Sequence, residues 1–281
     1  MKTTSILFFS LIFLLFSCGA KHHDQQVGGI DDADTVVKKE IDAGYAKASS
    51  LEKLAAKMVA SRESYLNEGK TEAEEVFINA FIEALKQPKA FETDFANLKK
   101  YEINVLTADD HKLRLFYWLS PYSGTMWHVQ NIVQYQGENN AVTAVSFNNL
   151  YGDKDDEGSP TPFFEHIYHL NTSPQKTYLL TGYGQMSGTE PYSVSHTLII
   201  NHSKFSINRP LFKLGKVIKT QLFASATLKE SQDKEKLMAQ LAMIYNSQDK
   251  TISYPEVNET KNGSVFSGKR KVLTFRDGMF Q

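Results

Sequence analysis

Three stretches of the chain carry residue types at spacings that suit chemistry. In the stretch DKDDEG, residues 153–158, the acidic residues Asp153, Asp155 and Glu157 alternate, and a glycine follows at the sixth position. This spacing imitates the start of a calcium loop, because calcium takes six to eight hard oxygen ligands. The twelfth position is Phe164 rather than a bidentate glutamate, and the flanks are typical of strands. We therefore expect a solvated hairpin loop, with a calcium site as the alternative.

The stretch EHIYH, residues 165–169, offers a carboxylate and two histidines for metal binding or acid–base chemistry. Its aromatic and β-branched residues favour a strand, on which successive side chains point to opposite faces. His166 and His169 then lie on opposite faces and cannot share one ion. We expect one histidine in the core and the other outside, and we assign no catalytic residue.

The stretch GYGQMSG, residues 182–188, follows a predicted strand, as a nucleotide-binding loop does. Its glycines have the spacing G-x-G-x-x-x-G, and the next element is predicted to be a strand. No helix N-terminus would then receive a phosphate. We expect a hairpin loop.

Four large aromatic residues, Trp118, Tyr122, Trp127 and Tyr135, surround one predicted hairpin. Exposed rings of this kind stack on sugars or contact protein partners. In a β-rich chain such rings more often pack the core. Tyr122 and Trp127 are the candidate binding residues.

The single cysteine, Cys18, follows the apolar run ILFFSLIFLLF of residues 6–16. Eleven helical residues span about 16 Å, which is short of the roughly 30 Å of a bilayer core. The run is typical of a signal peptide. The sequence Leu15-Phe16-Ser17-Cys18 resembles the lipobox of bacterial lipoproteins. That resemblance implies removal of residues 1–17 and acylation of Cys18, which anchors the protein to a membrane, because two or more acyl chains give stable attachment.

Composition excludes some partners. With 31 basic and 32 acidic side chains the formal charge is −1, which gives no electrostatic footprint for nucleic acid. Residues 18–34 are polar and glycine-rich and are expected to form a flexible linker.

Two amphipathic helices are expected within residues 35–94. Apolar residues recur every three or four positions, and Thr71 with Glu74 forms a capping box for the second helix. We expect a helical hairpin whose residues Leu51, Met58, Phe77 and Phe81 are buried against the rest of the protein.

From about residue 95 to residue 281 the apolar period is close to two, and polar turns recur regularly. This pattern predicts an antiparallel β domain, arranged as a sandwich, a barrel or a partial propeller. The fold class is therefore α+β, mainly antiparallel β, with an N-terminal helical hairpin. The expected strands are Glu102–Thr107, Lys112–Leu119, Met126–Tyr135, Ala141–Asn148, Phe163–Leu170, Lys176–Thr181, Ser193–Ile200, Phe205–Ile207, Thr220–Leu228, Leu237–Tyr245, Thr251–Tyr254 and Lys271–Phe275.

Two segments resemble uncharacterised secreted lipoproteins of Bacteroidota. The first is TADDHKLRLFYWLSPYSGTMWHVQNIVQY, residues 107–135, which is similar to the pattern T-S-P-D-G-K, then R-I-Y-S-W, G-G-T-M-H and Q-Y. The second runs from Gly268 to Phe280 and is similar to G-K-R…F-D-G-x-F. The resemblance implies a location in the bacterial cell envelope, at the outer membrane, facing the periplasm or the surface.

These observations favour a lipid-anchored, non-catalytic module that binds or scaffolds a protein partner or a glycan. The alternative is a hydrolase of envelope or dietary polymers that uses loop carboxylates. The sequence implies no cofactor apart from the calcium alternative.

Overall fold

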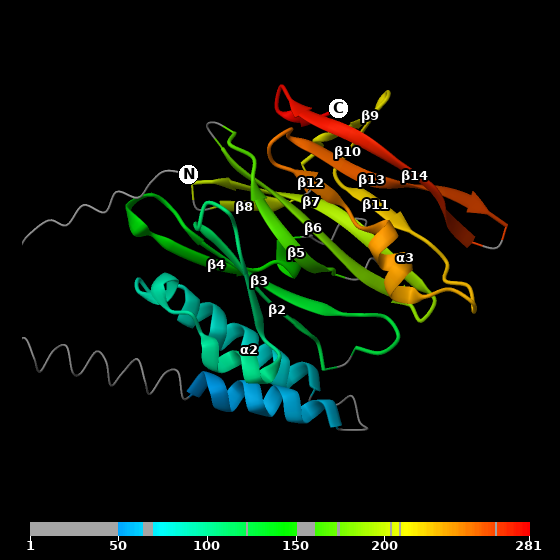
Figure 1. The fold of residues 1–281 in the computed structure, drawn as a ribbon. Coiled ribbons are helices and arrows are strands. Elements are labelled where there is room, and N and C mark those ends of the chain that lie inside the picture. Colours follow the sequence, from blue (N-terminus) through cyan, green and yellow to red (C-terminus); the bar gives the residue numbers. More distant parts are fainter. Residues whose placement is uncertain are drawn as a thin grey trace, which may run out of the picture. The chain divides into compact units, whose positions relative to one another are not determined.

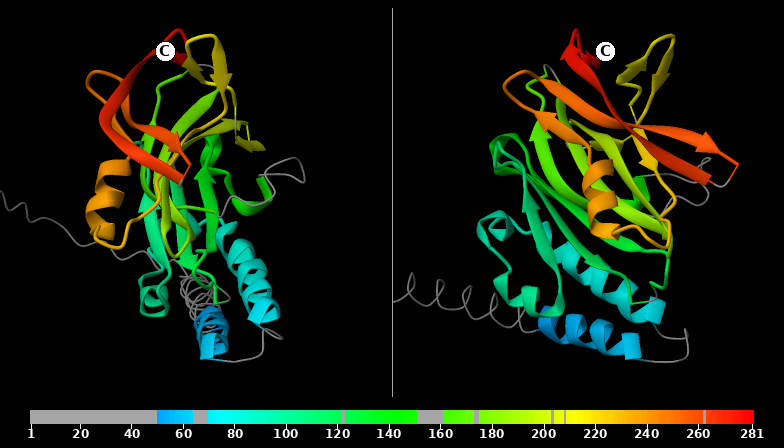
Figure 2. Two further views of the ribbon diagram at one scale, coloured as in Figure 1. Left: turned by 90° about the vertical axis from the view of Figure 1, so that its right-hand side faces the viewer. Right: turned by 45° about the vertical axis from the view of Figure 1, so that its right-hand side comes forward.

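The computed structural model describes residues 50–63, 70–121, 123–150, 161–172, 175–202, 204–207, 209–261 and 263–281. The chain divides into two units, Met1–Gly44 and Tyr45–Gln281, and every described residue belongs to the second unit. In that unit, one layer of helices and three β-sheets follow one another, as the two orientations in Figure 2 show.

The helix layer consists of the helical residues 50–60, the 3₁₀ turn η1 (Ser61–Glu63) and α2 (Lys70–Leu85). Two further 3₁₀ segments, η2 (Ala90–Glu92) and η3 (Ala96–Tyr101), lead into the first strand. Figure 1 shows the helices beneath the sheet that contains β2, β3 and β4.

The first sheet is an antiparallel meander in the order β1-β2-β3-β4. Its strands are β1 (Asn104–Thr107), β2 (Leu113–Leu119), β3 (Val129–Gln136) and β4 (Val142–Ser146). The short 3₁₀ turns η4 (Glu138–Asn140) and η5 (Asn148–Leu150) flank β4.

The second sheet has the order β11-β7-β6-β5, and β8 also pairs with β7. It contains β5 (Phe163–His169), β6 (Lys176–Ser187), β7 (Glu190–Asn201), β8 (Lys204–Ile207) and β11 (Leu222–Ser225). All of its pairings are antiparallel.

The third sheet has the order β10-β9-β15-β14-β13-β12, with one parallel pairing between β15 and β9. It contains β9 (Phe212–Leu214), β10 (Val217–Lys219), β12 (Ile244–Asn246), β13 (Thr251–Thr260), β14 (Gly263–Arg276) and β15 (Met279–Phe280). The helix α3 (Lys234–Leu241) packs beside β7 and β13.

Three apolar cores lie between these layers. The first joins Phe77 and Phe81 of α2 to Phe116 and Trp118 of β2. The second lies between the first and second sheets, and the third between the second sheet, α3 and the third sheet. Along β2 and β6, successive side chains enter different cores because strand side chains alternate between faces.

The predicted fold class is confirmed. The sheets are open, mostly antiparallel and stacked on one another, so among the three arrangements considered, the described residues form a sandwich with N-terminal helices. The predicted burial of Leu51, Met58, Phe77 and Phe81 is also confirmed. Residues 35–49 and the link at 64–69 lie outside the described residues.

The prediction of a strand over Leu237–Tyr245 is wrong. Residues Lys234–Leu241 form the helix α3, and the side chain of Asp233 accepts hydrogen bonds from the backbone N–H groups of Glu235 and Lys236. This N-cap satisfies donors that a helix otherwise leaves unpaired. Leu237 and Leu241, one helical turn apart, both enter the third core.

The prediction of a hairpin loop over Gly182–Gly188 is also wrong in its bounds. Strand β6 continues to Ser187, and the turn occupies only Gly188 and Thr189. The two earlier glycines are needed inside the strand, because a Cβ at Gly182 would lie 2.3 Å from the carbonyl oxygen of Phe163, and one at Gly184 would lie 2.3 Å from the hydroxyl of Tyr192. Glycine in a strand often marks such a close approach.

Other strands differ from their predicted bounds because they pair with segments that are distant in the sequence. Strands β13 and β14 are longer than predicted and form a twisted pair of Thr251–Thr260 with Gly263–Arg276. The short strands β9, β10 and β15 were not predicted, since each has only two or three residues and is held by its partner in the third sheet.

Candidate functional site

Several residues predicted to have a function lie outside the described residues. These are the lipidation residue Cys18, the aromatic residue Tyr122, and the calcium-loop residues Asp153, Asp155 and Glu157. Within the part of the chain that the structure describes, no group of three or more His, Cys, Asp or Glu side chains is placed to hold a metal ion. The described helices include none that is long and apolar enough to cross a bilayer.

The ring of Trp127 is half-buried among other aromatic rings. It makes T-shaped contacts with Phe163 at 5.6 Å and Tyr183 at 6.3 Å between ring centroids. The ammonium group of Lys234 lies 5.0 Å from the centre of the Trp127 ring, a favourable cation–π contact. Its neighbours occupy much of its surface, so Trp127 stays a weak binding candidate. Trp118 and Tyr135 are buried, as predicted for core residues.

The two histidines of β5 point to opposite faces, as the strand interpretation predicts. His169 packs on Tyr178, which belongs to the second core. His166 is exposed and packs on Tyr168, which borders the third core. A register shift lies between Phe164 and His166, but the opposed arrangement persists. The two imidazoles therefore do not form a joint site.

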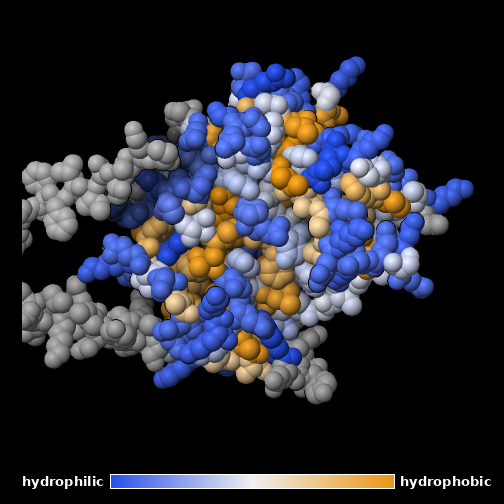
Figure 3. All heavy atoms as spheres, viewed as in Figure 1, coloured by the Kyte–Doolittle hydropathy of each residue, from blue (hydrophilic) through white to orange (hydrophobic). Residues whose placement is uncertain are grey.

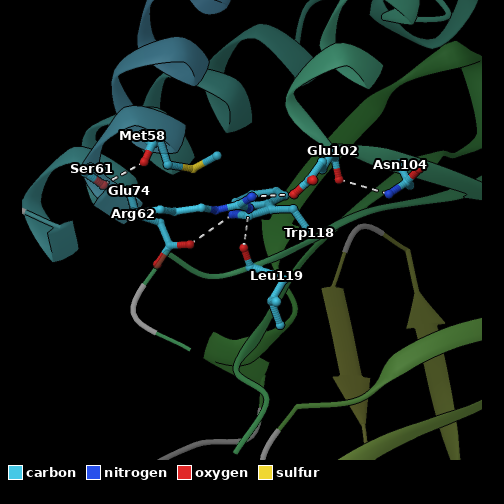
Figure 4. A network of polar contacts seen from close by, with 8 residues as sticks. All are labelled: Met58, Ser61, Arg62, Glu74, Glu102, Asn104, Trp118 and Leu119. Atoms are coloured by element: carbon cyan, nitrogen blue, oxygen red, sulfur yellow. Dashed lines mark hydrogen bonds and ion pairs between the residues drawn. The ribbon is translucent and has the colours of Figure 1, made fainter. Parts of the chain in front are cut away.

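Among the described residues, the one deeply buried carboxylate with several donors belongs to Glu74 of α2, a residue that is 2% exposed. Its Oε1 accepts a hydrogen bond from Trp118 Nε1 at 2.9 Å, and its Oε2 accepts one from Ser120 Oγ at 2.7 Å. Figure 4 shows this carboxylate beside Trp118 and Arg62. The Glu74 carboxylate thus bonds to residues of the first sheet, while the predicted capping box depends on Thr71, whose side chain lies outside the described part of the chain.

Arg62 completes this contact between the helices and the first sheet. Its guanidinium donates to the carbonyl oxygen of Leu119 at 2.8 Å and forms an ion pair with Glu102. Figure 4 shows the side chain extending between these two acceptors. Burial raises the pKa of Glu74, while the donors Ser120 and Trp118 and the charge of Arg62 partly oppose that rise. A carboxylate enclosed in this way has no access to a substrate, so the network fastens the helix layer to the sheet.

The segments 107–135 and 268–280 carry comparable structural bonds. Arg114 is buried and donates to Gln134 Oε1 and to the carbonyl oxygens of Ala90 and Thr93. In the second segment, Arg270 donates to the carbonyl oxygens of Gln240 and Ala242, at the end of α3. These guanidinium groups satisfy carbonyls at helix and turn ends.

On the face drawn in Figure 3, hydrophobic residues gather in several patches separated by hydrophilic ones. Scattered apolar residues are normal on protein surfaces, so exposure alone selects no site. Concavity is more informative. A groove of about 710 Å³ lies where β11 faces the third sheet, and its volume falls within the range of ligand sites.

We call this hollow the β11 groove. Three consecutive residues of β11 line it, together with parts of β9, β10, β13 and β14. The lining residues are Lys213, Leu214, Gly215, Lys219, Phe223, Ala224, Ser225, Tyr254, Pro255, Glu256, Val257, Glu259, Lys271, Val272 and Leu273.

Apolar side chains in the β11 groove are unusually exposed. Phe223 is 41% exposed although its ring stacks on Tyr192 at 5.3 Å, and Val272 is 59% exposed. Val217 and Ile218, on the adjoining strand β10, are exposed as well. Exposed apolar residues that share a concave surface indicate a contact site for another molecule.

The charges of the β11 groove are unevenly paired. Lys271 Nζ lies 2.9 Å from Glu256 Oε1, and this contact lowers the pKa of Glu256 and raises that of Lys271. The carboxylate of Glu259 accepts from Ser264 Oγ. Within the described residues, Lys213 and Lys219 have no carboxylate partner. The wall formed by β9 and β10 is therefore positively charged.

Sequence reasoning missed the β11 groove. The local signal was the stretch FKLGKVIKTQLF, residues 212–223, in which lysines alternate irregularly with apolar residues. That stretch has neither a helical nor a strict strand period, and its meeting with residues 254–273 depends on long-range pairing.

No protein-family model matches the chain, no curated protein matches it, and no solved structure matches its fold.

Replacement of Glu74 tests the buried network. Glu74→Leu should lower the free energy of unfolding by about 1–3 kcal/mol, because it leaves the buried Trp118 N–H and Ser120 O–H without an acceptor. Glu74→Gln keeps an acceptor and should cost less. Urea unfolding followed by tryptophan fluorescence measures both, with the exposed Glu75→Gln on the same helix as control.

The same variants carry a pH signature. Since the pKa of Glu74 is raised on folding, the folded state binds more protons between the unfolded and folded pKa values. The contribution of Glu74 to stability should be present below the unfolded pKa and be lost as pH rises through the folded pKa. The stability of the wild type relative to Glu74→Gln should therefore fall as pH rises above about 4.3, the pKa of an unperturbed glutamate. A difference that does not change with pH would contradict the burial-driven shift.

Proposed function

We propose that this chain is a lipid-anchored protein of the bacterial cell envelope whose β domain binds a protein partner in the β11 groove without catalysis. The observation that carries the binding proposal is the groove itself, which combines concavity, exposed Phe223 and Val272, and two lysines, Lys213 and Lys219, that have no carboxylate partner in the described part of the chain. The lipobox-like sequence ending at Cys18 supports the anchor.

The two carboxylates of the β11 groove are each bonded to a neighbouring side chain, which favours binding over hydrolysis. A hydrolase of polymers needs two carboxylates about 5–10 Å apart, one of which acts as an acid with a raised pKa. In the β11 groove, Lys271 holds the pKa of Glu256 low, and Ser264 donates to Glu259. Carboxylates held in this way act as fixed charges that orient a bound partner.

Calcium at Asp153, Asp155 and Glu157 remains a subsidiary proposal. It is supported by the alternation of acidic residues before Gly158. The proposed binding of a partner in the β11 groove does not depend on it.

The anchor is tested by replacing Cys18. Cys18→Ser should lack the acyl chains, retain residues 1–17 and leave the detergent-rich phase, because each acyl CH₂ contributes about 0.8 kcal/mol to membrane binding. Detergent phase partition and intact mass measure the change. Ser17→Ala keeps a small residue before the cysteine and should behave as the wild type. Unchanged mass and partition in Cys18→Ser would contradict the anchor.

The binding function is tested by selecting ligands with the purified domain. A displayed library of random twelve-residue peptides and a panel of envelope glycans are offered to the wild type. We expect peptides to be selected, and Phe223→Ser to weaken their binding about 30-fold or more, as removal of a central interface residue does. Val76→Ser, which alters an exposed valine of α2, is the control.

Two results would contradict the proposal. One is the selection of peptides that bind Phe223→Ser and the wild type equally well. The other is the selection of glycans rather than peptides.

A further inference from the structure

We propose that the partner segment is an extended acidic peptide that adds to the free edge of β11 as a further strand of the second sheet. This inference rests on the proposed function of the β11 groove and specifies how the partner is held. It follows from the direction of backbone hydrogen bonds, from the groove charges and from the exposed apolar side chains.

The register of β11 against β7 determines which backbone groups of β11 bond to β7 and which are left for another strand. Leu222 pairs with Ser195, and Ala224 pairs with Ser193. Beyond the strand, the N–H of Ala226 donates to the carbonyl oxygen of Pro191 and that of Leu228 donates to Thr189 in the same register. Even-numbered residues of this segment therefore direct their N–H and C=O groups to β7.

The odd-numbered residues direct the same groups away from β7, because the bonding direction alternates along an antiparallel strand. The N–H of Thr227 illustrates this, since it donates to the carbonyl oxygen of Ser264 on β14 at 2.8 Å. Phe223 and Ser225 share that direction, and both line the β11 groove. In the described part of the chain, no backbone acceptor pairs with the N–H of either residue.

On the opposite wall, the outer edge of β13 is closed to strand addition. Across β13 and β14 the N–H of Phe275 donates to the carbonyl oxygen of Lys250, so even-numbered residues up to Tyr254 face β14. Pro255 then faces away from β14, beyond the short pairing with β12. Proline has no N–H, and proline on a strand edge prevents the addition of another strand there. Strand addition is therefore directed to β11 rather than to β13. Val272 of β14 also directs its backbone groups away from β13, as Thr274 does toward Gln281, so a variant in β11 itself must decide between these two edges.

The charges and apolar side chains define the peptide. Its strand alternates side chains between two faces, so it offers apolar residues to Phe223 or Val272 and acidic residues to the lysines of the groove. Lys213 and Lys219 lie on opposite faces of the β9–β10 hairpin, and both line the groove. The edge from Leu222 to Ser225 is about 13 Å long at roughly 3.3 Å per residue. Four to six peptide residues fit it. Peptides bound in this way gain affinity from backbone bonds and specificity from alternate side chains.

The test uses a fluorescent peptide, acetyl-(Glu-Val)₄-amide, titrated with the full domain at low ionic strength. Ser225→Pro removes one free N–H donor of β11, whereas Ser225→Ala keeps it. We expect Ser225→Pro to weaken binding about tenfold or more, because the peptide carbonyl loses its donor, and Ser225→Ala to bind as the wild type. Melting temperature confirms that both variants are folded.

Two modified peptides provide a test that leaves the protein unchanged. N-methylation of all Glu residues or of all Val residues removes the N–H groups of one strand edge only. Strand addition predicts that one of these peptides loses binding and that the other keeps it. The reversed-charge peptide acetyl-(Lys-Val)₄-amide should bind about tenfold more weakly than the acidic peptide. The double variant Lys213→Glu, Lys219→Glu should reduce this difference in affinity between the two peptides.

Several outcomes would overturn the inference. They are equal binding to Ser225→Pro and Ser225→Ala, equal effects of the two N-methylated peptides, and no binding of the acidic peptide. Dimerisation of the free domain through β11, seen by sedimentation and abolished by Ser225→Pro, would also overturn it, because the edge would then hold a second copy. If library peptides still require Phe223 while Ser225→Pro binds them normally, the proposed function stands and only strand addition fails.

Discussion

The structure depends on the burial of the β6–β7 hairpin on both of its faces. Every residue from Pro191 to Ile200 of β7 is buried, and β6 contributes Tyr178 and Leu180 to the second core and Leu179 to the third. Because the hairpin has no solvent face, other layers must cover it on each side. The first sheet covers one face, while α3 and the third sheet cover the other.

This arrangement also determines where the backbone edges of the second sheet lie. Strand β7 is longer than any partner on its outer side, so β8 pairs with Leu198–Asn201 and β11 pairs with Tyr192–Ser195. Each of these short strands presents an edge of its own. The edge of β11 faces the third sheet across the groove, where Pro255 and the Lys271–Glu256 pair shape the opposite wall. The proposed site is thus a consequence of how the sandwich is closed.

The sequence predicted those elements whose apolar period is local and strong. The alternation in β2 and β3 and the helical stripe of Phe77 and Phe81 are of this kind. The strand prediction failed at α3 because a short apolar run fits either period, although Asp233 offered a capping signal. The bond between Glu74 and Trp118 was not predicted because the two residues are 44 positions apart in the sequence. The β11 groove depends on pairings that no local pattern encodes.

The most direct measurement of the central claim is amide hydrogen exchange along β11, resolved by NMR in the free protein. Amides bonded within a sheet exchange slowly, whereas unbonded amides at an edge exchange readily. We predict slow exchange at Leu222 and Ala224, and exchange about a hundredfold faster or more at Phe223 and Ser225. Uniform protection of residues 222–225, or protection of the odd-numbered amides instead, would show that the β11 edge is not free and would contradict the account.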